Sequence, residues 1–499
     1  MSSRLVYLVI LFGFTTCAIE GDGEYSPSPM STTFSNVLLI ISDDLATHAV
    51  GCYGNEIIRT PNIDRLAAEG ARFSRAYANS PMCTPSRAAL ITGRYPHAAG
   101  VTLLRTPLPD SAFTIAEYLK EQGFATGIFG KNHFNSDLKH GFDTVLTRQH
   151  HENRLAELPS GVSVRPIWKP FNDPARIWLN AEGATSGSDF ANSQGTFFAN
   201  ATIEFMRSNR KRRFLAVASF HEPHSPFNFP IEYANKYDPA LLELPLASDE
   251  DVRWVPAIFK ELTDEEKKGI TASYYSSVEY MDRNVGLLLG SLEEMGLAEN
   301  TLVIFVGDHG YLLNHHGRFE KHMMWEEAIT TPLIIRGFRD RVTLDQPVEL
   351  VDLVPTMLDA LALDPMPRLQ GQSLEPLLQS DTAETQEYIF AEYLEDNKAM
   401  IFDGRWKYIF TTGKRDLGSG YATGIGPSGV LHRLYDLQND PQETINVASQ
   451  HPTELGRLQQ VMTHRFRDTY PAGYVAGGLT VEAQLVRYCE PPEGWTPSK

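Results

Sequence analysis

The sequence predicts an α/β fold in which helices cover both faces of a large, mostly parallel sheet. Apolar runs of strand length recur along the chain, segments with helical periodicity lie between them, and polar clusters follow the ends of the runs. Runs without a polar face are typical of strands buried on both sides. Strands that alternate with helices favour parallel pairing. The expected strands are 36–42, 124–129, 214–220, 301–306 and 332–335.

Helical signals mark three segments among the first of these runs. We expect helices over 61–70, 86–92 and 114–122, and each ends at or just before a glycine. Glycine commonly terminates helices because it adopts a left-handed conformation at little cost. In the first segment, Ile63 and Leu66 are three residues apart and therefore share one apolar face.

The pattern changes from about residue 380, where short strand-like pieces are separated by glycines. This predicts a smaller C-terminal α+β subdomain that carries an antiparallel sheet. We therefore expect a main domain over 36–379, which would carry the chemistry, and a subdomain over 380–499. The expected C-terminal elements are strands 387–393, 400–402, 407–411 and 433–436, and a helix over 452–467.

The N-terminus has the pattern of an export signal over residues 1–18. Arg4 is the only charge before Glu20, and the apolar run between them is too short to span a bilayer. A cleavage site after Ala18 is expected, and a lipoprotein signal acylated at Cys17 is the alternative. Residues 19–35 are typical of a linker. We expect an exported protein, periplasmic or secreted and possibly lipid-anchored, without a later transmembrane segment.

Composition argues against several classes of protein. The 499 residues include 44 basic and 62 acidic side chains, so the formal net charge is −18. Such a chain is a poor non-specific binder of nucleic acid, because that binding requires Lys and Arg to neutralise phosphates. A hydrophobic fraction of 42% argues against disorder. Four cysteines are too few for a disulfide scaffold, and whether Cys52 and Cys489 pair is left open.

Polar clusters follow the expected strands, where open α/β sheets bind ligands. Asp43-Asp44 and Asp308-His309 offer ligands for a hard divalent cation, although an Asp after a strand is often only a turn or helix cap. Cys83 precedes an expected helix. It is a candidate for an anion site at the helix N-terminus, for a thiolate nucleophile or for a simple core cysteine.

The run around this cysteine resembles the signature of a known family. Cys-Thr-Pro-Ser-Arg over 83–87, followed by Ala-Ala-Leu-Ile-Thr-Gly-Arg over 88–94, is similar to the motif of the formylglycine-dependent sulfatases, in the alkaline-phosphatase-like superfamily. Further segments are similar to family elements, although His309 stands where many relatives carry Asn. The resemblance spans about 36–448. These segments are Gly-Lys-Asn-His over 130–133, His-Glu-Pro-His-Ser-Pro over 221–226, Gly-Asp-His-Gly over 307–310, Gly-Arg-Phe-Glu-Lys over 317–321, and Leu-Tyr-Asp-Leu over 434–437 with Asp-Pro-Gln-Glu over 440–443.

The resemblance implies the cofactors and the site. Cys83 would be converted by a separate maturation enzyme to formylglycine (3-oxoalanine), whose hydrate attacks sulfur. His224 or Lys321 would protonate the leaving alcohol, and His133 would take the proton of the second hydroxyl. The implied ligands of one Ca²⁺ are Asp43, Asp44, Asp308, His309 and residue 83. The groups implied to neutralise the sulfuryl charge are Arg87, Lys131 and Lys321. Our candidates for substrate binding are His221, Arg105, Arg318, His322 and Trp325.

The resemblance favours a sulfuric ester hydrolase that acts on a sulfated carbohydrate. The run over 317–327 is more similar to sulfatases of glycans than to those of small aryl esters. A phosphonate monoester or phosphodiester hydrolase with the same core is the alternative enzyme. A non-catalytic binder of sulfated glycans, in which Cys83 stays unmodified, is the third hypothesis. No prediction of the oligomeric state follows.

Overall fold

The computed structural model describes most of the chain after the N-terminal segment. The expected export signal, with Cys17, and the linker up to residue 33 lie outside the described residues. No helix of the described part is long and apolar enough to cross a membrane. The cysteines at 52, 83 and 489 are all free. The described residues are 34–157, 167–183, 189–245, 247–248, 255–380, 383, 386–412, 429–470, 474 and 478–490.

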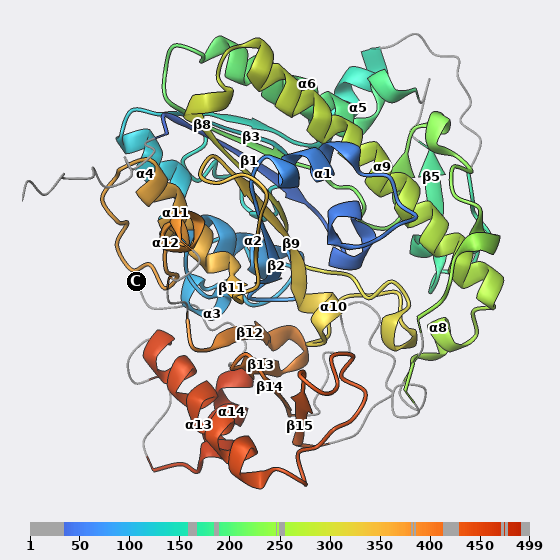
Figure 1. The fold of residues 1–499 in the computed structure, drawn as a ribbon, viewed down its shortest axis with the longest axis vertical. Coiled ribbons are helices and arrows are strands. Elements are labelled where there is room, and N and C mark those ends of the chain that lie inside the picture. Colours follow the sequence, from blue (N-terminus) through green and yellow to red (C-terminus); the bar gives the residue numbers. More distant parts are fainter. Residues whose placement is uncertain are drawn as a thin grey trace, which may run out of the picture. The chain divides into compact units, whose positions relative to one another are not determined.

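The main sheet confirms the predicted fold class. Its strand order is β10-β2-β9-β8-β1-β6-β3-β4, with β11 paired to β2, and every neighbouring pair is parallel except the two that β9 makes with β8 and β2. Figure 1 shows this sheet with helices on both sides. The strands are β1 (Asn36–Ser42), β2 (Ala71–Tyr77), β3 (Ala125–Gly130), β4 (Thr144–Leu146), β6 (Phe214–Ser219), β8 (Thr301–Gly307), β9 (Thr330–Arg336), β10 (Val342–Leu344) and β11 (Val348–Glu349).

Four predicted apolar runs form the centre of the sheet as β8, β1, β6 and β3. Successive side chains of β1 face opposite cores, so Val37 and Leu39 lie in one cluster and Leu38 and Ile40 in the other. Because both faces are buried, the five positions between Asn36 and Ser42 are all apolar. The fifth run forms β9, which the sequence did not predict to be antiparallel.

Helices supply both cores. One cluster joins the sheet to α1 (Pro61–Ala68), α6 (Gln194–Ser208) and α9 (Asp264–Glu294). The other joins it to α2 (Cys83–Thr92), α4 (Ile115–Glu121), α11 (Leu353–Ala360) and α12 (Glu375–Gln379). The three predicted helices are confirmed as α1, α2 and α4, and Thr114 caps α4 in a capping box with Glu117. Further helices of this part are α3 (Pro96–Ala99), α5 (Arg148–Glu157), α8 (Ala257–Lys260) and α10 (Glu326–Ile329).

The C-terminal antiparallel sheet is confirmed as well. Its order is β12-β13-β14-β15. One face of this sheet packs against α13 (Pro452–Thr469) and α14 (Val481–Cys489). The other face contacts Met82, Met324 and Ile329 of the main part. The glycine-rich stretch at 413–428 lies outside the described residues, and the domain boundary at 379/380 stays a prediction. The strands are β12 (Ile389–Tyr393), β13 (Lys398–Phe402), β14 (Trp406–Thr411) and β15 (Leu431–Asp436); a small separate sheet pairs β5 (Ala181–Gly183) with β7 (Phe227–Phe229).

Candidate active site

The parallel core of the sheet brings four polar clusters to one edge. Strands β8, β1, β6 and β3 are neighbours in this order, and their last residues pair across the sheet. Ser42 pairs with Gly307, and Gly130 pairs with Ser219. The segments that follow these residues carry the predicted carboxylates, lysine and histidines. They therefore leave the sheet side by side, as expected for a ligand site at the carboxyl edge.

Helix α2 places Cys83 at this edge. Cys83 is the first residue of the helix, after Met82 in an extended conformation, and it is only 1% exposed. All ten residues of α2 are buried, and Ser86 Oγ donates a hydrogen bond to the carbonyl oxygen of Asp308. The helix N-terminus, with its unpaired amides and positive dipole, is thus fixed against the end of β8.

Three buried carboxylates surround the thiol. Asp43, Asp44 and Asp308 are at most 1% exposed, and ligand atoms of Asp43, Cys83, Asp308 and His309 lie within 4.8 Å of one another. Oδ1 of Asp43 and Oδ2 of Asp44 have no hydrogen-bond partner. Buried carboxylate oxygens without partners are unfavourable unless a cation neutralises them. This donor set fits a hard divalent metal.

Three cationic side chains oppose the carboxylates. Arg87 Nε lies 2.7 Å from Asp308 Oδ2, and the Lys131 ammonium pairs with Asp43. Nζ of Lys321 lies 2.5 Å from Asp44 Oδ1 and 3.3 Å from Cys83 Sγ. The site therefore holds a dense set of buried opposite charges, in which a bound anion would meet several cations.

The charges control the protonation of residue 83 and its neighbour. Burial and the Asp43 carboxylate each raise the pKa of the Cys83 thiol, but Lys131, Lys321 and His309 outweigh them and hold it well below its usual value. Burial alone would lower the pKa of His309. The negative charges of Asp308 and Cys83 outweigh this effect and raise the pKa to about 9. An anion at residue 83 is therefore electrostatically favoured here.

Three further histidines lie around the thiol. His221 and His224 stack with ring centroids 4.7 Å apart, and Nδ1 of His221 lies 3.2 Å from Asp43 Oδ2. Burial lowers the pKa of His221 to about 4, so its imidazole is neutral near pH 7. His133 lies beside Cys83, and its Nδ1 is 3.2 Å from Thr84 Oγ1.

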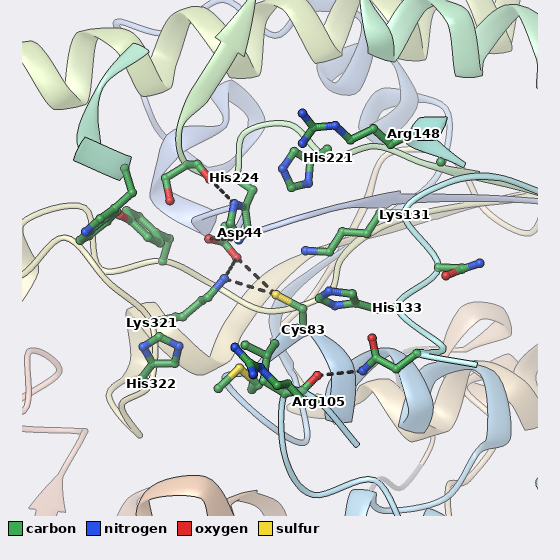
Figure 2. Close-up of a pocket in the computed structure, with 18 of the residues that line it drawn as sticks. Asp44, Cys83, Arg105, Lys131, His133, Arg148, His221, His224, Lys321 and His322 are labelled. Atoms are coloured by element: carbon green, nitrogen blue, oxygen red, sulfur yellow. Dashed lines mark hydrogen bonds and ion pairs between the residues drawn. The ribbon is translucent and has the colours of Figure 1, made fainter. Parts of the chain in front are cut away.

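Part of this cluster lines a cavity of about 750 Å³. Asp43, Arg87, Asp308 and His309 are not among its lining residues. Figure 2 shows Cys83 at its centre, between the lysines and histidines. Arg318 and Trp325 do not line it: Arg318 pairs with Glu320 at 2.7 Å, and Trp325 stacks on His316 at 4.0 Å. The expected residues that line it are Asp44, Cys83, Arg105, Lys131, His133, His221, His224, Lys321 and His322.

Sequence reasoning missed other wall residues. Arg148 begins α5, Trp178 lies in a short turn of 3-10 helix, and Tyr393 ends β12 in the C-terminal sheet. None lies in a motif or directly follows a predicted main-sheet strand. Tyr274 on α9 was also missed: its hydroxyl donates to the Asp44 carbonyl at 2.6 Å and accepts from the Ala46 amide at 2.8 Å. It fixes the backbone that carries the carboxylates.

Comparisons with protein families agree with this geometry. A family model described as sulfatase matches residues 35–363. A second model, described as the C-terminal part of N-sulphoglucosamine sulphohydrolase, matches residues 314–470. Together the two matches cover the main sheet and all four strands of the C-terminal sheet.

Individual proteins resemble the chain along most of its length. An ulvan-active sulfatase of Formosa agariphila is 29% identical over 391 residues, which cover 76% of this chain and 72% of that protein. A phosphonate monoester hydrolase from Silicibacter pomeroyi has a similar structure, with a TM-score of 0.70, 23% identity, and coverage of 87% of this chain and 95% of that one. A structure solved with its substrate D-glucosamine-2-N,6-O-disulfate has a TM-score of 0.65 and 22% identity, and covers 88% and 98% of the two chains.

Proposed function

The chain belongs to the sulfatase family of sulfuric ester hydrolases, and we propose that it removes sulfate from a sulfated carbohydrate with a formylglycine at residue 83 and one divalent cation, Ca²⁺. The observation that carries this proposal is the position of Cys83. It lies at a helix N-terminus, near buried carboxylate oxygens that accept no hydrogen bond and within reach of cationic side chains. Export of the protein and maturation of Cys83 by a separate enzyme belong to the same proposal.

The metal would be held by side chains at the strand ends. The proposed ligands are Asp43, Asp44, Asp308, His309 and an oxygen of residue 83. Two facts support this assignment: one oxygen each of Asp43 and Asp44 accepts no hydrogen bond, and the other donor atoms lie close by. A divalent cation at this position would stabilise negative charge on the sulfate oxygens. Arg87 and Lys131, held on Asp308 and Asp43, would add positive charge on the same side.

A hydrated aldehyde at residue 83 would supply one hydroxyl to attack sulfur and a second whose deprotonation releases sulfate. His133 would accept that proton. The Thr84 hydroxyl donates its only hydrogen to the Leu104 carbonyl, at 2.8 Å, so it can only accept from Nδ1 of His133. The ring proton of His133 is thereby fixed on Nδ1, and Nε2 keeps its lone pair.

The leaving alcohol needs a proton donor on the pocket side. His224 Nδ1 donates to the carbonyl oxygen of Ser225 at 2.5 Å, and its Nε2 lies 3.8 Å from Asp44 Oδ2. His224 would therefore act as an acid in its imidazolium form, with the second proton on Nε2. Lys321 is the second candidate, because its ammonium lies next to residue 83. Both side chains line the cavity (Figure 2), and the proposed acid is one of these two.

The carbohydrate part of the proposal is supported by relatives and by the pocket. One relative is named as active on ulvan, and one structural neighbour contains a sulfated glucosamine. A cavity of about 750 Å³ offers room well beyond a sulfate group. The phosphonate monoester hydrolase neighbour keeps phosphonate or phosphodiester cleavage as the second candidate activity.

One comparison of substrates tests the proposal. Sulfate release is measured on defined sulfated mono- and oligosaccharides, beside phosphate release from a phosphodiester and cleavage of a phosphonate monoester. Turnover of a sulfated sugar well above both phosphorus substrates is expected, and the opposite order would overturn the proposal. Mass spectrometry of the Cys83 peptide should show a loss of about 18 Da, from replacement of the thiol by an aldehyde. A Cys83→Ser variant is the matched control and should show neither turnover nor the mass change.

A further inference from the structure

The pocket wall carries an arginine without a partner in the protein. Arg105 is exposed and lines the cavity. Its guanidinium makes no hydrogen bond or ion pair with any residue that the structure describes. In the view of Figure 2, Arg105 and Arg148 lie on opposite sides of Cys83. Arg105 is thus a cation at the edge of the active site that is free to bind a ligand.

The loop that carries Arg105 is fixed on several sides. The amide of Leu104 donates to Glu395 at 2.8 Å, and the carbonyl of Leu104 accepts from Thr84 at 2.8 Å and from Asn135 at 2.9 Å. Asn135 also donates to the carbonyl of Thr106, at 3.2 Å. These partners come from the C-terminal sheet, from α2 and from the segment after β3. Such anchoring lowers the entropy cost of binding through the loop.

Two other charged side chains that line the cavity have charged partners. Arg148 pairs with Glu152 at 2.8 Å, and Glu320 pairs with Arg318 at 2.7 Å. Glu395 also lines the cavity, and its carboxylate accepts the amide of Leu104, the residue before Arg105. Arg105 therefore differs from Arg148 in having no charged partner among the residues that the structure describes.

We infer that Arg105 binds a second anionic group of the substrate, a carboxylate or a further sulfate on the same or the adjoining sugar. The planar guanidinium donates two parallel hydrogen bonds to such a group. Trp178 and Tyr393 also line the cavity and would offer aromatic surface for a sugar ring. This inference rests on the proposed function, and it narrows the substrate class to sugars that carry at least two negative charges.

The test uses matched pairs of sulfated sugars on the matured full-length enzyme. Glucosamine 6-O-sulfate is compared with glucosamine N,6-O-disulfate, and glucose 2-O-sulfate with glucuronate 2-O-sulfate. The disulfate arm reports a second sulfate, and the glucuronate arm reports a carboxylate. The variants are Arg105→Gln, Arg105→Lys and, as a control distant in function, Arg207→Gln on α6, whose side chain is an exposed partner of Glu204.

We expect the wild-type enzyme to prefer the doubly charged member of at least one pair. Arg105→Gln should reduce that preference in kcat/KM by about ten-fold or more, mainly through KM, because one charge-assisted hydrogen-bonding group is lost. Arg105→Lys should restore part of the preference, and Arg207→Gln should retain all of it. Equal loss for both members of a pair, or no wild-type preference, would overturn the inference alone. Turnover of phosphorus esters with no sulfated sugar accepted would overturn the proposed function as well.

Discussion

Nδ1 of His133 lies 3.2 Å from Oγ1 of Thr84, and the hydrogen of that hydroxyl is already donated to the Leu104 carbonyl. The tautomer of His133 is therefore set by a residue adjacent to the proposed nucleophile. Thr84→Val keeps the shape of the side chain but removes the acceptor. We expect kcat to fall by about ten-fold or more with little change in KM, since the ring would lose its fixed proton position.

The matched variant for this prediction is Thr84→Ser, which keeps the hydroxyl and should retain most of the activity. The pH profile of kcat should change in shape for Thr84→Val and stay the same for Thr84→Ser. A Thr84→Val enzyme with unchanged kcat and an unchanged pH profile would show that His133 does not depend on this contact.

Removal of the metal should both inactivate and destabilise the protein. Asp43, Asp44 and Asp308 are buried and lie close together, so without a cation their charges are only partly compensated by lysine and arginine. A cation present at about 100 times its Kd stabilises the folded state by about 2.7 kcal/mol. We expect a chelator to lower the melting temperature and to abolish sulfate release, and added Ca²⁺ to restore both.

Asp43→Asn serves as the control for the chelator experiment. It removes a proposed ligand, so its melting temperature should respond much less to the chelator. If exhaustive chelation left the activity and melting temperature of the wild-type protein unchanged, the metal assignment would be wrong.

Gly130 should be intolerant of any side chain. Its φ is +115°, and an added Cβ would lie 1.8 Å from the carbonyl oxygen of Ser219 on the neighbouring strand. Gly130→Ala must therefore displace the end of β3, directly before Lys131. We expect a loss of about 3 kcal/mol or more in the free energy of unfolding, measured by urea denaturation, together with loss of activity.

Gly123 provides a matched comparison because its φ is +83° but no atom lies within 4 Å of the added Cβ. Gly123→Ala should cost only about 1–2 kcal/mol of backbone strain and leave turnover intact. Equal destabilisation by the two substitutions would contradict the steric argument.

A buried glutamate between the two sheets should make stability depend on pH. Glu443 pairs with Lys407 at 2.8 Å, and burial raises its pKa from 4.5 to about 7, with Glu326 nearby. Between these two pH values the folded chain holds a proton that the unfolded chain releases. Stability from this group is therefore complete below pH 4.5 and is lost as the pH rises through 7.

We expect Glu443→Gln to flatten the decline in the free energy of unfolding between pH 5 and 7. Glu265→Gln, at an exposed position on α9, should leave the slope as in the wild-type protein. Other buried groups titrate in the same range, so the difference between variant and wild type is the quantity to measure. A slope identical in all three proteins would exclude this role for Glu443.

The central strands could be predicted because strands that are buried on both faces have continuous runs of apolar residues. The run at 36–42 forms β1 with the predicted bounds. Strand β2 was not predicted, since Ala71–Tyr77 mixes apolar and polar residues at a position near the edge of the sheet. The 31-residue helix α9 was also missed, because its buried face carries glycine, serine and tyrosine beside apolar residues and so lacks a clear apolar periodicity. The antiparallel direction of β9 depends on neighbours that are distant in sequence.

Some residues of the candidate site could be predicted from the sequence and others could not. Residues that directly follow strands, such as Asp43 and Lys131, could be predicted because parallel strands deliver their ends to one edge. Tyr393 and Arg148 could not, because their positions depend on the packing of the C-terminal sheet and of α5. Arg318 was predicted for the pocket but pairs with Glu320 behind the wall, a distinction that spacing in the sequence does not reveal.

The burial of Cys83 has a consequence for the order of events in the life of the protein. A sugar sulfate can reach residue 83 through the cavity, but a second enzyme cannot enclose a residue that is 1% exposed at the start of a fully buried helix. The proposed oxidation of Cys83 must therefore occur while the chain is still unfolded. Oxidation must then precede folding. Chains that fold before they meet the maturation enzyme stay inactive even when every other part of the site is correctly formed.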